Sequence, residues 1–198
     1  NNDANKPKAE RMYDDRKPDA GRLAVVAKRL VDIVHAIDTT RPVTSALSFP
    51  ELSTRTGYAD ALDASGYNYK EQFYEEDHAR FPGRVIYGSE TSSMVFSRGI
   101  YHFPETANIL CDDDLQCSSL LNSATSWGAK DLRIMFTEDR NTEFSLGQFM
   151  WTGIGYIGEP TPYHTRNSYF GYADTACFPK DLYYLFQSMW IAAPMAHI

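Results

Sequence analysis

The stretch Arg84–Glu90, which reads RVIYGSE, decides the fold that this sequence predicts. Val85, Ile86 and Tyr87 are residue types that favour β-structure, so residues 84–89 are expected to form a buried strand. A carboxylate, Glu90, follows this strand directly. Burying an ionised carboxylate is costly unless hydrogen bonds offset the loss of water. Glu90 is therefore either one half of a strand-end ion pair or a functional group, and its spacing leaves both interpretations open.

Aromatic residues end the strands expected on either side of this one. The segment Gly66–Tyr69 (GYNY) ends the preceding strand, and Phe149–Gly153 (FMWTG) ends the following one. Neighbouring ends of parallel strands face one another, so a tyrosine hydroxyl could reach Glu90 and keep it ionised. An indole there could form a floor under a sugar ring. A tyrosine-rich turn and a core tryptophan are the simpler alternatives for each motif alone. The combination favours carboxylate catalysis at an anomeric carbon.

Short apolar runs alternate with amphipathic stretches along the chain, which is typical of parallel β-α units. A helix is expected from Asp19, its cap, to Asp38, and its apolar residues recur at three- and four-residue steps. Those residues are Leu23, Val26, Ala27, Leu30, Val31, Val34 and Ile37. Further helices are predicted at 71–80, 127–139 and 181–190, and the stretch 94–126 reads as long and irregular. Strands are predicted at 43–47, 63–67, 84–89 and 144–151.

Four such strands make half of an eight-stranded (β/α)₈ TIM barrel, a fold that usually needs about 250 residues. An open four-stranded α/β sheet is the alternative. Every predicted strand ends in polar or aromatic residues, as the active face of a barrel does. These strand ends are Ser48, Asn68–Tyr69, Ser89–Glu90 and Trp151–Thr152.

Composition excludes several other classes of protein. The chain is 43% hydrophobic and 23% charged, which is typical of a globular domain. Its net charge is −7 and no Lys/Arg cluster occurs, so no nucleic-acid partner is expected. No window of about 18 apolar residues exists, so no membrane span is expected. The 3 cysteines form no metal-ligand pattern; they indicate free thiols, with a Cys111–Cys117 bridge as the alternative. No cofactor is predicted.

Motifs along nearly the whole chain closely resemble the barrel of family 2 retaining glycoside hydrolases, and of their β-galactosidases in particular. The motifs, in chain order, are HAIDTTRPVTSAL (35–47), DASGYNYKEQFYEEDHARFPGRVI (63–86), RVIYGSETSS (84–93), RGIYHFP (98–104), QCSS (116–119), GQFMWTG (147–153), YIGEPTPY (156–163) and SYFGYADTACFPKDLYYLFQSMW (168–190). The resemblance implies that residues 1–190 are the last four β-α units of a TIM barrel, and that 191–198 begin a linker to a following domain.

The resemblance also implies roles for four residues. Glu90 matches the nucleophile, and Tyr69 matches the tyrosine that contacts and orients it. Asn68 matches a sugar-site position, and Trp151 matches the tryptophan that lines the sugar subsite. The implied reaction is double displacement at a β-galactoside with retention of configuration, without a metal or cofactor.

The sequence departs from the family pattern at the general acid/base, which in the family is a Glu after Asn at the fourth strand. No Asn-Glu pair precedes the first helix, and Glu10 lies in an expected loop. The acid/base is therefore expected upstream of Asn1, in a parent chain that also supplies the N-terminal half barrel and β-sandwich domains. The 198-residue chain alone is expected to be inactive; if it were active, Glu159 would be the first candidate acid. Gly155 stands where the family often carries Asp.

The sequence leaves several activities open. β-Glucuronidases of the family carry Asn-x-Lys before the glycine that follows the eighth strand, whereas residues 168–170 here are Ser-Tyr-Phe, which favours a neutral sugar. β-Mannosidase activity, arabinosidase activity and a non-catalytic sugar-binding barrel also stay open. A cation could bind at Asp112, Asp113, Asp114 or His164, but a solvated acidic loop is the simpler interpretation of the aspartates. Periplasmic, secreted and cytoplasmic locations are all compatible with the sequence.

Overall fold

The computed structural model describes residues 19–101, 109–111, 116–118, 137, 140–160 and 166–197. The chain divides into two compact units. Unit 1 comprises Asn1–Thr91 and Met135–Phe149, and unit 2 comprises Ser92–Ile134 and Met150–Ile198.

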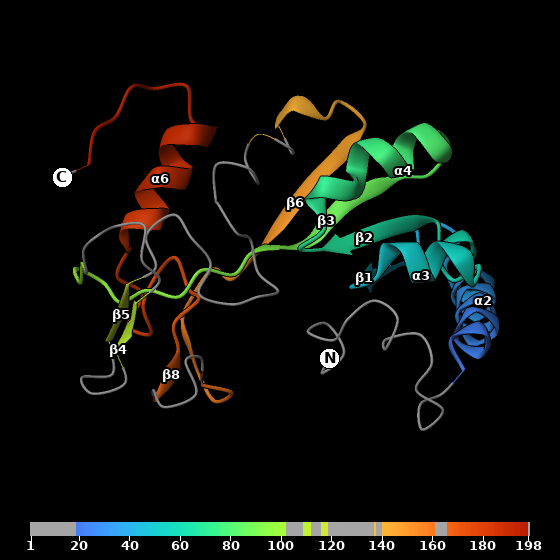
Figure 1. Cartoon of the computed structure of the whole chain (residues 1–198), viewed down its shortest axis with the longest axis horizontal. Helices are drawn as coiled ribbons and strands as arrows, with labels where there is room; N and C mark the ends of the chain where they lie inside the picture. Colours follow the sequence, from blue (N-terminus) through green and yellow to red (C-terminus); the bar gives the residue numbers. More distant parts are fainter. Residues whose placement is uncertain are drawn as a thin grey trace. The chain divides into compact units, whose positions relative to one another are not determined.

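Unit 1 is built on a four-stranded sheet of order β1-β2-β3-β6 (Figure 1). Its strands are β1 (Thr44–Leu47), β2 (Ala64–Asn68), β3 (Ile86–Ser92) and β6 (Ser145–Trp151), the last two continuing into unit 2. β1 pairs with β2, and β2 with β3, in parallel. The four strands predicted from the sequence are therefore confirmed, together with the parallel α/β sheet.

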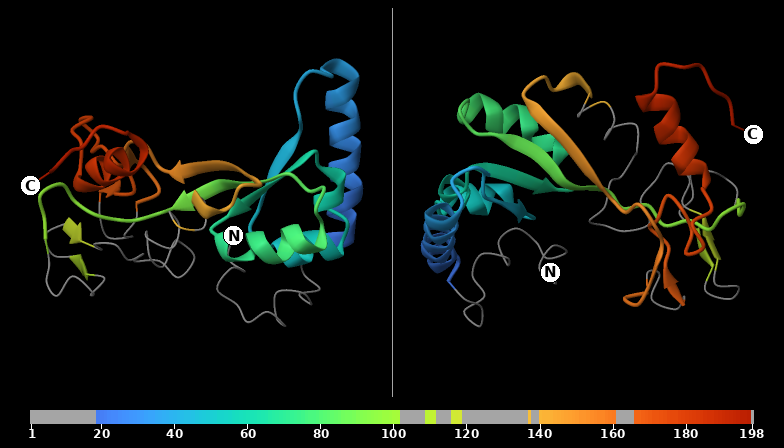
Figure 2. Two further views of the ribbon diagram at one scale, coloured as in Figure 1. Left: turned by 90° about the horizontal axis from the view of Figure 1, so that it is seen from above. Right: turned by 180° about the vertical axis from the view of Figure 1, so that it is seen from behind.

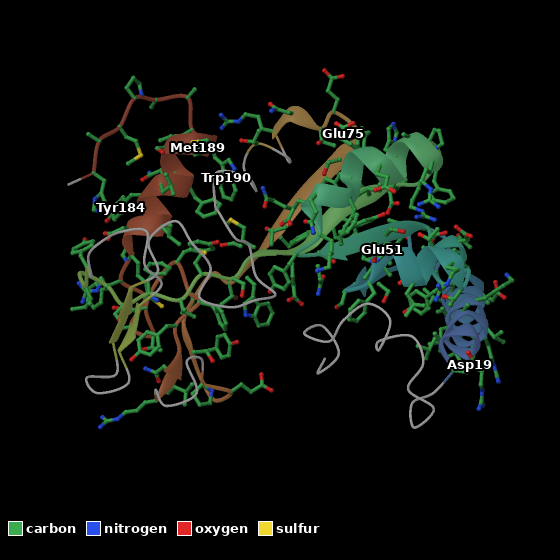
Figure 3. The ribbon with its side chains drawn as sticks, viewed as in Figure 1. Asp19, Glu51, Glu75, Tyr184, Met189 and Trp190 are labelled. Carbon is green, nitrogen blue, oxygen red and sulfur yellow. The ribbon has the colours of Figure 1, made fainter. Side chains whose placement is uncertain are left out.

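The helices of unit 1 follow the predicted pattern. Helix α2 (Ala20–Ile37) begins after Asp19, whose Oδ1 accepts a 2.9 Å hydrogen bond from the Gly21 amide (Figure 3). Helix α3 (Pro50–Arg55) and the short η1 (Ala59–Ala61) connect β1 to β2. The helix predicted at 71–80 is present as η2 (Glu71–Phe73) followed by α4 (Tyr74–Arg80). Figure 2 shows α3 and α4 on the same face of the sheet.

That helix-covered face holds the core of unit 1. Tyr67 of β2, Ile86 of β3 and Tyr74 of α4 are fully buried together, and the two tyrosine rings meet edge to face at 5.4 Å. The Tyr67 hydroxyl donates a 2.6 Å hydrogen bond to the buried carboxylate of Asp77. Burial, reinforced by this bond, raises the pKa of Tyr67 well above its ordinary value. The phenol therefore stays neutral and available as a donor to Asp77.

The opposite face of the sheet is much less covered by the described residues. Thr44 and Ala46 of β1 are exposed, and Phe149 of β6 keeps 68% of its surface exposed. The Tyr87 ring meets Phe149 edge to face at 5.9 Å on this face, and its hydroxyl lies 3.0 Å from the Thr44 hydroxyl. Apolar and aromatic surface on this scale is normally buried against another layer.

Helix α2 also leaves most of its apolar face exposed. Of its predicted apolar face, only Ala27 and Val31 are buried. The structure therefore confirms the helix but not the burial of its apolar face, because the described residues that pack on α2 cover only a narrow stripe of it. The apolar residues of that face that stay exposed are Leu23, Val26, Leu30, Val34 and Ile37.

The described residues of unit 2 form two short antiparallel strand pairs and the helix α6 (Asp181–Trp190). β4 (Ile109–Cys111) pairs with β5 (Gln116–Ser118), and β7 (Tyr156–Ile157) pairs with β8 (Asn167–Ser168). The sequence predicted irregular structure over 94–126, so that prediction was wrong at β4 and β5. The helix predicted at 181–190 is confirmed as α6 (Asp181–Trp190), whereas most of the helix predicted at 127–139 lies outside the described residues. No described helix is long and apolar enough to cross a membrane.

A buried lysine joins the loops of unit 2. Lys180 is 2% exposed, and its ammonium group donates hydrogen bonds of 2.9 and 3.0 Å to the carbonyl oxygens of Phe96 and Tyr169. The hydroxyl of the buried Tyr172 donates to the Ser92 hydroxyl, and its ring packs against Phe186 of α6. These contacts tie the buried segment after β3 to the loop before α6.

Gly88 of β3 has no room for a side chain. A methyl group there would lie 2.5 Å from Thr91 Cγ2 and 3.0 Å from the Tyr74 hydroxyl. We expect Gly88→Ala to lower the free energy of unfolding by about 1–3 kcal/mol, since overpacking displaces its neighbours. Urea unfolding followed by tryptophan fluorescence measures this. Gly83→Ala, with nothing within 4 Å, is the control; an equal effect of both substitutions would contradict the packing explanation.

Candidate active site

Glu90 lies in β3 opposite the end of β2, where the sheet is irregular. Tyr67 pairs with Gly88, but the next residue, Asn68, pairs with Glu90, so β3 contains one extra residue, Ser89. This is a β-bulge, a feature that redirects side chains and is common beside active sites. The sequence placed Glu90 just after the strand; the bulge instead lets β3 continue to Ser92 with Glu90, half-buried, inside it.

Tyr69 contacts Glu90 through both its side chain and its backbone. The Tyr69 hydroxyl donates a 2.8 Å hydrogen bond to Glu90 Oε2, and the Tyr69 amide donates a 2.9 Å hydrogen bond to the Glu90 carbonyl oxygen. Tyr69 has φ of +56°, in the left-handed region that non-glycine residues seldom occupy. Strained backbone of this kind is concentrated at functional sites. A charge-assisted hydrogen bond of this kind holds the carboxylate in one orientation.

Asn68 lies beside this pair and is bonded to Ser89. The Ser89 hydroxyl donates a 2.6 Å hydrogen bond to Asn68 Oδ1. One strand further, the Thr91 hydroxyl donates a 2.6 Å hydrogen bond to Gln148 Oε1 of β6. Sequence reasoning missed Gln148, and it noted Ser89 only as a polar residue at a strand end, without a role. Strand periodicity does not show that Ser89 occupies a bulge.

Trp151 belongs to unit 2. Its indole is half-buried, packs on the cluster of Val95 and Phe170, and meets the Tyr156 ring edge to face at 6.1 Å. The Trp151–Thr152 peptide bond is cis. The site residues that the structure brings together are therefore Asn68, Tyr69 and Glu90 of unit 1.

The remaining candidates divide into described and undescribed residues. Glu159 is exposed in unit 2, and Gly155 is buried there. Glu10, Asp112, Asp113, Asp114 and His164 all lie outside the described residues. Within the described part of the chain, no group of three or more His, Cys, Asp or Glu residues could hold a metal ion. Cys177 is exposed with a free thiol.

A carboxylate bonded to a tyrosine hydroxyl, at the end of parallel strands, defines a class of site that can attack or stabilise an electron-poor carbon. No protein-family model matches the chain. The chain is 35% identical over 189 residues to β-galactosidase BoGH2A of Bacteroides ovatus, a match that covers 88% of this chain and 22% of that enzyme. It is also 44% identical over 63 residues to a protein of Formosa agariphila named for β-glucuronidase activity, covering 30% of this chain and 6% of that protein.

A solved structure shares the fold. A glycosyl hydrolase family 2 member from Bacteroides cellulosilyticus superposes with a TM-score of 0.57 at 23% identity, over 86% of this chain and 17% of that one. These comparisons support the assignment of the chain as a fragment of a family 2 glycoside hydrolase, the family predicted from the sequence. The chain spans about a fifth of the length of the Bacteroides ovatus relative.

Proposed function

We propose that this chain carries the nucleophile of a retaining β-galactosidase, and that the nucleophile is Glu90. The observation that carries the proposal is the 2.8 Å hydrogen bond from the Tyr69 hydroxyl to Glu90 Oε2 beside the β-bulge. Retaining glycosidases need a carboxylate that is ionised and fixed in orientation, so that one oxygen can attack the anomeric carbon. The bond to Tyr69 Oη engages Oε2 and leaves Oε1 to attack.

The reaction takes place in two displacements. Glu90 forms a bond to the anomeric carbon while a general acid protonates the departing glycosidic oxygen. The same group, now a base, removes a proton from water, which attacks the anomeric carbon and releases Glu90. That acid/base would be supplied by a polypeptide segment outside residues 1–198, with its carboxyl group about 5–5.5 Å from Glu90.

The proposed function also implies that the chain is part of a (β/α)₈ barrel. Residues 1–190 would form its last four β-α units, and 191–198 would lead into a further domain. Two features of unit 1 support an additional layer: the exposed sheet face with Phe149 and the exposed apolar residues of α2, including Leu30 and Ile37. The first half of the barrel, within the same polypeptide, is the proposed occupant of both surfaces, and Trp151 is proposed to line the sugar subsite.

A neutral sugar, rather than a sugar acid, is the glycone that we propose. The chain matches a β-galactosidase at 35% identity over 88% of its length, and the β-glucuronidase relative at 44% identity over 30%. Residues 168–170 carry no cation, and Arg98 of unit 2 is 3.0 Å from the Asp174 carboxylate. The Lys180 ammonium is buried against two carbonyl oxygens. A glucuronide carboxylate would need a cation that is available to bind it.

Replacing the nucleophile tests the proposal directly. In the complete enzyme, we expect Glu90→Gln to lower the turnover of an aryl β-galactoside by more than about 10³-fold, because the amide cannot form the glycosyl intermediate. Glu75→Gln, an exposed carboxylate of α4, is the matched control and should leave turnover unchanged (Figure 3). An aryl β-glucuronide assayed in parallel should be the poorer substrate. Residual Glu90→Gln activity above about a tenth of wild type would contradict the assignment.

Removing the Tyr69 hydroxyl should affect the covalent steps more than binding. We expect Tyr69→Phe to lower kcat by about 10–100-fold with KM changed less than about threefold, because a hydrogen bond to a charged group contributes about 1.5–3 kcal/mol. Steady-state kinetics on the complete enzyme measure both constants. Tyr58→Phe, which removes a hydroxyl bonded to Ser45 at 3.0 Å, is the control. A change in KM alone would make Tyr69 a binding residue.

The 198-residue chain alone should not hydrolyse glycosides. Glu90 needs a partner that protonates the leaving group, and such assistance is typically worth about 10²–10⁴-fold. Expression of residues 1–198 and an assay with an aryl β-galactoside test this. Turnover that is lost on Glu90→Gln would place the acid within this chain, and Glu159→Gln would then be the next variant to assay.

A further inference from the structure

The β-bulge places the Ser89 side chain beside Asn68. No step of the proposed mechanism uses Ser89. Ser89 is the extra residue of β3, inserted between the pairs Tyr67–Gly88 and Asn68–Glu90. Because side chains alternate along a regular strand, this insertion changes the face on which the residues after it would lie. It allows the side chains of Ser89 and Glu90, adjacent in sequence, to reach Asn68 and Tyr69 respectively.

The Ser89 hydroxyl fixes the orientation of the Asn68 side-chain amide. It donates a 2.6 Å hydrogen bond to Asn68 Oδ1, so the carbonyl oxygen of the amide is engaged within the protein. The other end of the amide carries two N–H donors. Asn68 is half-buried and lies opposite Glu90 in the strand register, so these donors lie at the same strand end as the proposed nucleophile.

Gly66 provides the space that Ser89 needs. A methyl group on Gly66 would lie 2.5 Å from Ser89 Oγ, 2.6 Å from Ser89 Cβ and 2.9 Å from the Tyr87 hydroxyl. Contacts this short are not tolerated, so a side chain at position 66 and Ser89 in its present place exclude each other. Three features therefore place the Ser89 hydroxyl against Asn68: the absence of a side chain at Gly66, the extra residue in β3 and the hydrogen bond itself.

We propose that Ser89 is a positioning residue that holds the Asn68 amide with its NH₂ group toward the sugar, where it donates to one hydroxyl group of the glycone. The proposal rests on the proposed function, because a sugar whose anomeric carbon lies at Glu90 is the one that Asn68 can contact. Without the Ser89 hydroxyl, the amide loses the partner that orients it and can present either its oxygen or its nitrogen. The sugar hydroxyl then loses a fixed donor.

A double-mutant cycle in the complete enzyme tests whether Ser89 acts through Asn68. We expect Ser89→Ala to lower kcat/KM for an aryl β-galactoside by about three- to tenfold, the range of one neutral hydrogen bond. In an Asn68→Ala background, Ser89→Ala should have no further effect, because its partner is absent. Effects that multiply in the double variant would overturn the proposal.

Deoxy substrates show whether Ser89 acts on one particular sugar hydroxyl, which a merely structural role of Ser89 would not do. Aryl β-galactosides lacking one hydroxyl at a time should include one for which Asn68→Ala costs nothing, and Ser89→Ala should cost nothing for that same substrate. A Ser89→Ala penalty that is equal for all of them would overturn the proposal. Ser45→Ala, which removes another sheet hydroxyl of unit 1, should affect every substrate equally or not at all.

Two further variants distinguish a failure of the proposed role of Ser89 from a failure of the proposed function. Asn68→Asp keeps the acceptor for Ser89 but removes the N–H donors, so it should lose the same deoxy-substrate discrimination even if Ser89→Ala fails to fold; retained discrimination would overturn the proposal. Glu90→Gln reports on the proposed function. If Glu90→Gln stays active, the nucleophile assignment fails, whereas a Glu90-dependent enzyme with independent Ser89 and Asn68 effects overturns only the role of Ser89.

Discussion

The hydrogen bond from the Tyr69 hydroxyl to Glu90 imposes the main constraint on unit 1. For it to form, the ends of β2 and β3 must lie side by side and out of regular register. The bulge at Ser89 provides the offset, and the left-handed backbone of Tyr69 turns the phenol toward the carboxylate. Both features cost backbone energy that surrounding structure must offset. The buried cluster of Tyr67, Tyr74 and Ile86 lies on the other face of the same strands and provides that support.

Glycines make this arrangement sterically possible. Gly66 leaves space for Ser89 on one face, and Gly88 leaves space for Thr91 and Tyr74 on the other. The polar groups at the end of β3 also orient one another: Ser89 bonds Asn68, and Thr91 bonds Gln148. A site held by fixed neighbours does not have to reorganise during the reaction, and this pre-organisation is a large part of catalysis by electrostatic stabilisation.

Much of the fold could be predicted from the sequence because strand and helix periodicity are local properties. The strands, α2 with its Asp19 cap and α6 agree with the pattern of apolar residues. The bulge could not be predicted, because register depends on a partner strand that the local pattern does not contain. The exposure of Leu30 and Ile37 was missed for a similar reason: an apolar stripe shows that a helix face can be buried, not what buries it. The strands of two or three residues in unit 2 are too short to show a period.

The proposed mechanism depends above all on a covalent bond between Glu90 and the sugar. A 2-fluoro β-galactoside with a good leaving group tests it most directly, because the fluorine destabilises the oxocarbenium-like transition state and allows the glycosyl-enzyme to accumulate. Mass spectrometry of the complete enzyme after digestion should locate one added fluorosugar on the peptide that contains Gly88–Thr91, with the label on Glu90. A label on any other carboxylate, or inactivation without a covalent label, would contradict the proposed mechanism.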